Sequence, residues 1–238
     1  MAIEHLLFVL LGFAASIVSS VFGFGTALIV LALGPYILPI KETIALATVL
    51  FVASTVTKTV LFGRHIEWKA AATMALASLP FSYFGASLVA ELPANLLRLM
   101  LGAMILVYLG LSTFELLPKF KVGLVGLVGG SAAYGFVSGL LGSGNLVKAV
   151  MFKEMNLSKE AFVGAMAATS VLSNAAKLTA YTNTGLLNVD LVWPMIGLAL
   201  SGVVVAVLGR RFLGKISTAQ FEVGFNIILA ASAVGLLF

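Results

Sequence analysis

The sequence contains no cysteine and only two histidines, His5 and His65. Without thiols the chain can form neither disulfides nor thiolate metal sites, and thiol redox chemistry is excluded. Two isolated imidazoles are too few for a transition-metal site, which gathers several nitrogen or sulfur ligands. We therefore expect no metal and no other cofactor.

Charge is also scarce. Charged residues make up 10% of the chain and hydrophobic residues 61%, whereas a soluble domain has about 25% and about 45–50%. With a mean hydropathy of +1.14, a soluble fold would lack the polar surface needed to cover itself. The apolar runs are continuous rather than alternating, which is typical of membrane helices. The composition predicts an all-α integral membrane protein, for which the lipid bilayer is an obligatory partner.

Carboxylates are absent from the interior of the apolar runs. A cation site or a proton relay within a membrane needs such groups, so a cation transporter is disfavoured and an anion carrier favoured. No nucleophile–base pair, phosphate loop or metal motif is present, and we predict no enzymatic activity. The nine acidic residues lie in loops or near segment ends, at Glu4, Glu42, Glu67, Glu91, Glu115, Glu154, Glu160, Asp190 and Glu222.

Eight apolar segments organise the chain. About 20 residues cross a bilayer as a helix, so the first and fifth segments are too long for one crossing. Each contains a Gly-x-Gly sequence, Gly23-Phe24-Gly25 and Gly142-Ser143-Gly144, which weakens a helix and allows the backbone to turn. We expect both to fold as broken hairpins. The segments are Leu6–Leu38, Thr43–Phe62, Ala70–Ala90, Leu96–Leu117, Val122–Met151, Ala161–Tyr181, Leu191–Leu208 and Phe221–Phe238. No basic region precedes the first, so we expect it to belong to the mature protein.

The two halves of the chain resemble each other. Lys41-Glu42 corresponds to Lys159-Glu160, and the pairs Ser54/Ser173 and Lys58/Lys177 recur at the same interval as the glycine breaks. We interpret the chain as two repeats of about 119 residues, 1–118 and 119–238, in one transmembrane domain.

The distribution of basic residues favours inverted repeats. If both long segments fold back at their glycines, ten loop lysines and arginines share one side and two lie on the other. If all segments cross once, the split is only eight to four. The positive-inside rule prefers the first arrangement, with both termini outside the cytoplasm. The ten are Arg64, Lys69, Lys119, Lys121, Lys148, Lys153, Lys159, Arg210, Arg211 and Lys215, against Lys41 and Arg98. Because these charges lie singly between apolar runs, the net charge of +5 does not indicate nucleic-acid binding.

The glycine breaks are the first candidate site. A broken helix leaves free N–H groups at the start of its second half, where the helix dipole attracts anions. Neighbouring polar side chains could add hydrogen-bond donors. The alternative is that the glycines only allow close helix packing. The candidate residues are Gly23, Gly25, Thr26, Gly142, Ser143, Gly144 and Asn145.

Two lysines inside apolar segments are the second candidate. Each lies four residues after a serine, a spacing that places both side chains on one helix face. An ionisable residue within a membrane span is costly and is usually functional, although a lysine can also extend its side chain to the interface. The candidates are Ser54, Thr55 and Lys58, and Ser173, Asn174 and Lys177. Aromatic residues within the segments, such as Tyr134, are interpreted as packing residues.

These features together resemble the sulfite exporter family TauE/SafE. The resemblance covers the whole chain and rests on two halves that each open with a glycine-rich break followed by Lys-Glu. It implies a bacterial inner-membrane permease that exports sulfite or an organosulfonate such as sulfoacetate. An anion channel, a passive facilitator or a non-transporting scaffold subunit are alternatives on the same scaffold. The expected partner is a small anionic substrate, and a homodimer remains open.

Overall fold

The computed structural model describes residues 2–22, 25–113, 123–153 and 157–209, and within these ranges every regular element is a helix. Their order is α1 (Ala2–Phe22), α2 (Thr26–Leu33), η1 (Gly34–Tyr36), α3 (Ile40–Phe62), η2 (Gly63–His65), α4 (Trp68–Glu91), α5 (Ala94–Thr113), α6 (Leu124–Leu141), α7 (Asn145–Lys153), α8 (Lys159–Asn183), η3 (Val189–Leu191) and α9 (Val192–Gly209).

Several helices are long and apolar enough to cross a membrane. Four stretches meet both conditions: Ile40–His65, Trp68–Glu91, Ala94–Leu111 and Val189–Gly209. Large apolar side chains also cover the outside of the molecule, Val60, Leu76 and Ile196 among them, as lipid contact requires. The predicted all-helical membrane class is confirmed. The eighth segment, 221–238, lies outside the described residues, so the number of crossings stays a prediction.

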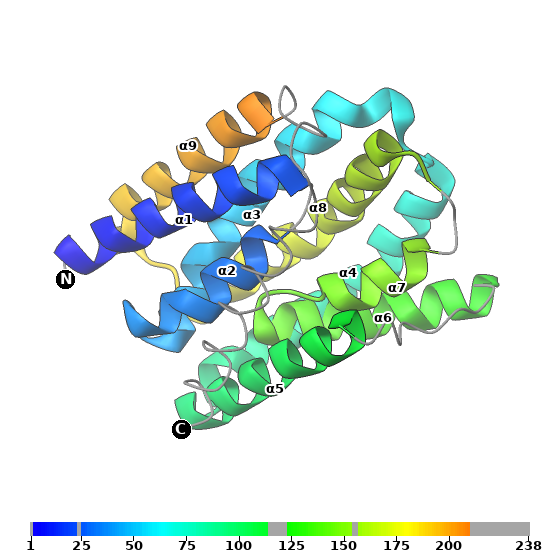
Figure 1. The fold of residues 1–238 in the computed structure, drawn as a ribbon. Helices are drawn as coiled ribbons and strands as arrows, with labels where there is room; N and C mark the ends of the chain where they lie inside the picture. The colour runs from blue at the N-terminus through cyan, green and yellow to red at the C-terminus, as the bar shows by residue number, and fades with distance from the viewer. Residues whose placement is uncertain (1, 23–24, 114–122, 154–156, 210–238) are drawn as a thin grey trace.

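The first and fifth apolar segments are each divided at the glycines that the sequence singled out. Gly25 precedes α2 with a φ of 110°, and Gly142 ends α6 with a φ of 82°. Both angles lie in the left-handed region, where glycine carries no Cβ penalty. After the first break, α2 turns back beside α1 (Figure 1). After the second, α7 packs against α6.

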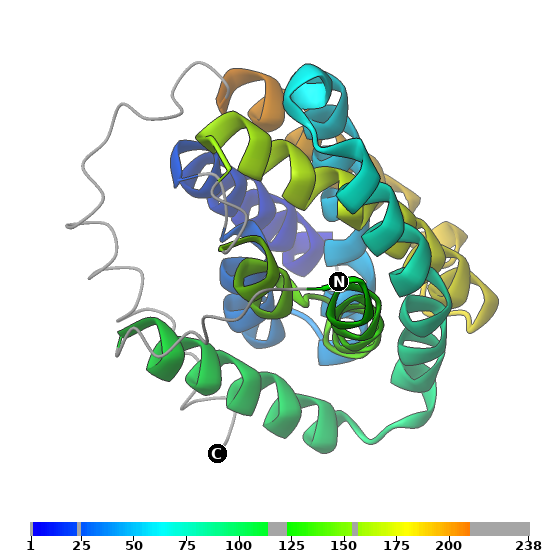
Figure 2. The same cartoon turned by 90° about the vertical axis from the view of Figure 1, so that its right-hand side faces the viewer.

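Helix packing follows a matched pattern in the two halves. The central pair is α3 and α8; α4 packs on α6 and α8, while α9 packs on α1 and α3. If α1, α3 and α4 correspond to α6, α8 and α9, the contacts of α4 with α6 and α8 match those of α9 with α1 and α3. Figure 2 shows α5 along the side of the bundle opposite α9. The repeat boundaries and the inverted orientation stay predictions.

Helices α4 and α6 approach each other closely. A Cβ built on Gly139 would lie 2.3 Å from the carbonyl oxygen of Ser82, and one on Gly135 would lie 2.3 Å from that of Ser78. Only glycine fits at such positions, as is common where membrane helices pack closely. This contact fixes α6, and with it the second glycine break, against the body of the protein.

Candidate functional site

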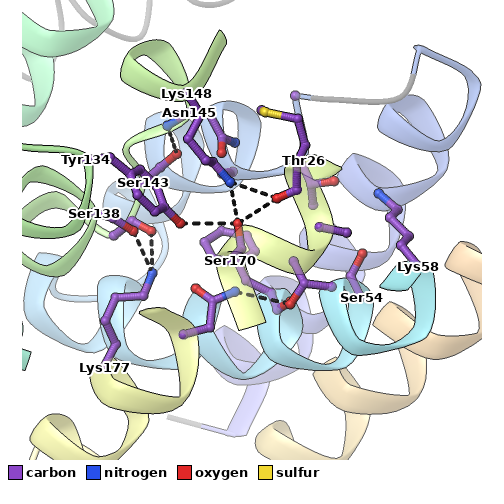
Figure 3. Close-up of a pocket in the computed structure, with 18 of the residues that line it drawn as sticks. Thr26, Ser54, Lys58, Tyr134, Ser138, Ser143, Asn145, Lys148, Ser170 and Lys177 are labelled. Carbon is purple, nitrogen blue, oxygen red and sulfur yellow. Dashed lines mark hydrogen bonds between the residues drawn. The ribbon is translucent and has the colours of Figure 1, made fainter. Parts of the chain in front are cut away.

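A cavity of about 90 Å³ lies where the two broken segments meet α3 and α8 (Figure 3). A water needs about 10–15 Å³ by this measure, so the space can hold a small molecule of several heavy atoms. The lining residues come from both predicted halves. They are Gly25, Thr26, Ala27, Phe51, Ser54, Thr55, Lys58, Tyr134, Ser138, Gly142, Ser143, Asn145, Lys148, Val163, Met166, Ala167, Ser170, Asn174 and Lys177.

Both glycine breaks reach this cavity. Gly25 and Thr26 line it at the start of α2, and Ser143 and Asn145 line it at the start of α7. The first N–H groups of a helix have no partner within the helix, and the dipole makes this end partly positive. Because α2 and α7 both begin at this cavity, their N-termini favour an anion within it.

Lys177 on α8 donates hydrogen bonds to the C-terminal end of α6. Its Nζ donates to the carbonyl oxygen of Gly142 at 2.9 Å and to Oγ of Ser138 at 3.3 Å. It also lies 5.8 Å from the ring centroid of Phe51. The last carbonyls of a helix are unpaired and carry partial negative charge, which a nearby ammonium stabilises. The side chain is only 1% exposed, so Lys177 does not reach an interface.

Lys148 on α7 is the second buried ammonium of the cavity. Its Nζ donates to the carbonyl oxygen of Met166 at 2.9 Å and to Oγ of Ser170, both on α8. It lies 4.7 Å from the ring centroid of Tyr134, whose hydroxyl donates to Ser170 at 3.2 Å. With 1% exposure, Lys148 lies as deep as Lys177. Counting it among the loop charges was wrong, because α7 carries it into the cavity.

Lys58 on α3 faces the cavity in a different way. It is half-buried, and within the described part of the chain its Nζ has no hydrogen-bond partner. Figure 3 shows it across the cavity from Lys148 and Lys177, with no interaction drawn to it. Its ammonium is therefore available to a ligand without breaking an existing bond.

The cavity is thus cationic and rich in hydroxyls. It is lined by Lys58, Lys148 and Lys177, and among its described lining residues there is no carboxylate. Asn174 adds an amide, which donates to Oγ1 of Thr55 at 3.3 Å and so links α8 to α3. Ammonium, hydroxyl and backbone N–H groups around a small space suit an oxyanion, whose charge is spread over several oxygens.

Most of the residues predicted from sequence meet at this cavity. Two described candidates do not line it: Gly144 packs against Tyr134, and Ser173 is bonded at 2.7 Å to Ser82 of α4. Ser173 shares the α8 face with Lys177, but α4 covers that edge of the face. Gly23 lies outside the described residues. The candidates that line the cavity are Gly25, Thr26, Ser54, Thr55, Lys58, Gly142, Ser143, Asn145, Asn174 and Lys177.

Sequence reasoning missed Lys148, Tyr134, Ser138 and Ser170. A signal existed for Lys148, because it lies inside the apolar segment 122–151 just after the second break. Ser170 lies four residues before Asn174 and seven before Lys177, which is the spacing of one helix face. Tyr134 was assigned to packing, whereas its ring and hydroxyl both contact polar groups of the cavity.

The fold and the cavity define a helical membrane protein with a buried polar site between its helices. A protein-family model described as "Sulfite exporter TauE/SafE" matches residues 8–236. The chain belongs to this family, as the resemblance of its sequence motifs implied. No curated protein and no solved structure matches it.

Proposed function

We propose that this protein is a multi-pass permease of the inner membrane that exports a small sulfur oxyanion or an organosulfonate, such as sulfite or sulfoacetate. The observation that carries the proposal is the convergence of Lys58, Lys148 and Lys177 on one cavity with no carboxylate among its described lining. Such a site attracts anions and repels cations. The family match supports the direction of transport and the sulfur chemistry of the substrate.

The matched helix packing supports a carrier in which the binding site lies between two repeats. The cavity takes Ser54, Thr55 and Lys58 from one predicted half and Asn174 and Lys177 from the other. In transporters built from inverted repeats, substrate sites lie at the repeat interface, near broken helices. In this proposal, the two halves move around the anion and expose it to each side in turn.

Transport in proteoliposomes tests the proposal. Vesicles containing the purified protein are loaded with radiolabelled sulfite, sulfate, thiosulfate or sulfoacetate, and efflux is followed over a range of concentrations. We expect saturable efflux of at least one of these anions and counterflow when unlabelled anion is added outside. Efflux that neither saturates nor shows counterflow would indicate a channel. Absence of flux for every anion would indicate a scaffold subunit and reject the proposal.

The matched control separates the cavity from general surface charge. Lys69 is an exposed lysine in the first turn of α4. Lys69→Met removes the same charge as Lys58→Met without touching the cavity. Loss of flux in Lys58→Met together with normal flux in Lys69→Met supports a site in the cavity, whereas equal flux in both contradicts it.

A further inference from the structure

No carboxylate among the described lining residues balances the positive charge of the cavity. Lys148 and Lys177 are each 1% exposed, and the described lining offers neither of them a carboxylate. An isolated buried charge costs several kcal/mol, and in practice such a group is neutralised by exchange of its proton. When an anion occupies the cavity, the same ammonium groups gain a counter-charge. Anion occupancy and lysine protonation are therefore linked.

The three lysines are not equally able to lose a proton. Lys58 is only half-buried, so water can stabilise its charge. Lys177 donates to Gly142 at the C-terminal end of α6, where the helix dipole favours a cation. Lys148 is as buried as Lys177, but its acceptors are the carbonyl oxygen of Met166 and the hydroxyl of Ser170 in the interior of α8, so no helix C-terminus stabilises its charge.

That carbonyl is also shared with other donors. The hydroxyls of Thr169 and Ser170 both donate to the carbonyl oxygen of Met166, at 3.1 and 2.9 Å. The titratable groups that face Lys148 are Tyr134 on α6 and Lys177 on α8, and Lys58 on α3 lines the same cavity. None of these is an anion in its ordinary state at neutral pH. Lys148 is accordingly the ammonium with most to gain from a bound anion.

We propose that Lys148 couples anion transport to protons, an inference that rests on the proposed anion site. In the empty cavity its amine is neutral. When an anion enters, the amine takes one proton from cavity water; when the anion leaves, the ammonium returns that proton to water. The hydroxyls of Ser170 and Tyr134, which line the cavity beside Lys148, can relay this proton. Anion and proton then cross the membrane in the same direction, so the anion gradient and the proton gradient are linked.

Calorimetry on the purified full-length protein tests the coupling. Sodium sulfite is titrated at neutral pH in two buffers of different ionisation enthalpy, which gives the protons taken up per anion bound. Sulfite itself exchanges protons near this pH, so the decisive quantity is the difference between variants. We expect Lys148→Met to take up about one proton fewer per anion than the wild type, since one titrating group is removed. Lys69→Met should match the wild type.

Lys148→Arg provides a second, independent variant. Arginine remains protonated in proteins, so this variant should bind sulfite while also taking up about one proton fewer than the wild type. Equal proton uptake in wild type, Lys148→Met and Lys148→Arg, with sulfite bound in all three, would overturn the coupling and leave the anion site intact. If the wild type binds no sulfite, the coupling is rejected together with sulfite as the substrate.

Discussion

Lys58 and Lys177 occupy corresponding positions in the predicted repeats, yet their ammonium groups have different surroundings. Lys177 is held by Gly142 and Ser138, while Lys58 has no hydrogen-bond partner in the described part of the chain. A lysine that already makes hydrogen bonds contributes both to the stability of the fold and to the electrostatic field in the cavity. A lysine without a partner contributes to the field alone, and substitutions can separate the two roles.

We expect Lys58→Met to weaken the apparent affinity for anion by about 10- to 100-fold, the range for loss of a hydrogen bond to a charged group. No hydrogen bond of Lys58 within the described part of the chain is lost, so the melting temperature in detergent should remain that of the wild type. Concentration-dependent efflux and thermal unfolding on the same preparation measure both quantities. A large fall in melting temperature would mean that Lys58 is structural.

Lys177→Met should lower both the apparent affinity for anion and the melting temperature. The methionine has similar length but leaves the buried carbonyl of Gly142 without its donor, at a cost of about 1–3 kcal/mol. Lys177→Arg keeps the charge but replaces a compact ammonium with a wide planar group, and we expect partial transport at best. Full transport in both variants would remove Lys177 from the site.

For single residues, the sequence predicted which residue types belong to the site better than it predicted where their side chains point. The pair Lys58 and Lys177 could be found because each is a cation inside an apolar segment with small polar neighbours. Lys148 is also a cation inside an apolar segment, but its orientation depends on where α7 begins after the break. Ser173 shows a different limit: the spacing places it on the helix face of Lys177, but only the tertiary packing shows that it is hydrogen-bonded to Ser82 of α4.

The breaks between α1 and α2 and between α6 and α7 were predictable as elements. Two glycines within a long apolar run indicate a break without any knowledge of tertiary structure. From the sequence the two breaks were treated as one candidate site, and the described residues Gly25 and Gly142 both line the cavity. The packing of α4 on α6 and of α9 on α1 was not predictable, since the composition of similar apolar helices does not indicate which of them pack together.

Gly142→Ala tests whether the second break matters beyond its backbone angle. Gly185 also has a positive φ, 75°, but a Cβ there would meet nothing within 4 Å. Both alanines should cost about 1–2 kcal/mol from backbone strain. Only Gly142→Ala should also reduce transport, because it moves the carbonyl that holds Lys177. Equal transport by the two variants in efflux assays would mean that the second break has only a structural role.

Gly139→Ala tests the contact between α4 and α6. The added Cβ would lie 2.3 Å from the carbonyl oxygen of Ser82, so the helices must separate, at a cost of about 1–3 kcal/mol. Gly129, on the same helix, has nothing within 4 Å of its Cβ position. Thermal unfolding in detergent should show a lower melting temperature for Gly139→Ala and an unchanged or slightly higher one for Gly129→Ala, because alanine favours a helix over glycine. A normal melting temperature for Gly139→Ala would mean that the helices separate freely.

For the whole molecule, the placement of Lys148 changes the topology argument without reversing it. With this residue inside the cavity, nine loop cations rather than ten share one side in the inverted arrangement, still against two. We therefore expect both termini outside the cytoplasm. Alkaline phosphatase, which works only outside, should be active when fused to either end, and green fluorescent protein should not fluoresce. A fluorescent fusion at either end would contradict the hairpin topology.

The pairing of α1 with α9 also affects the order in which the helices can pack during synthesis. During synthesis α1 leaves the ribosome first, but about 170 residues separate it from α9, its principal partner among the described helices. At about 5–20 residues per second, α1 waits roughly 10–30 s for α9. Over that interval its inner face, including Phe8, must be covered by lipid, by a chaperone or by a temporary neighbour. The order of insertion and the order of packing therefore differ, and a chain interrupted before α9 would leave the inner face of α1 without the helix that covers it.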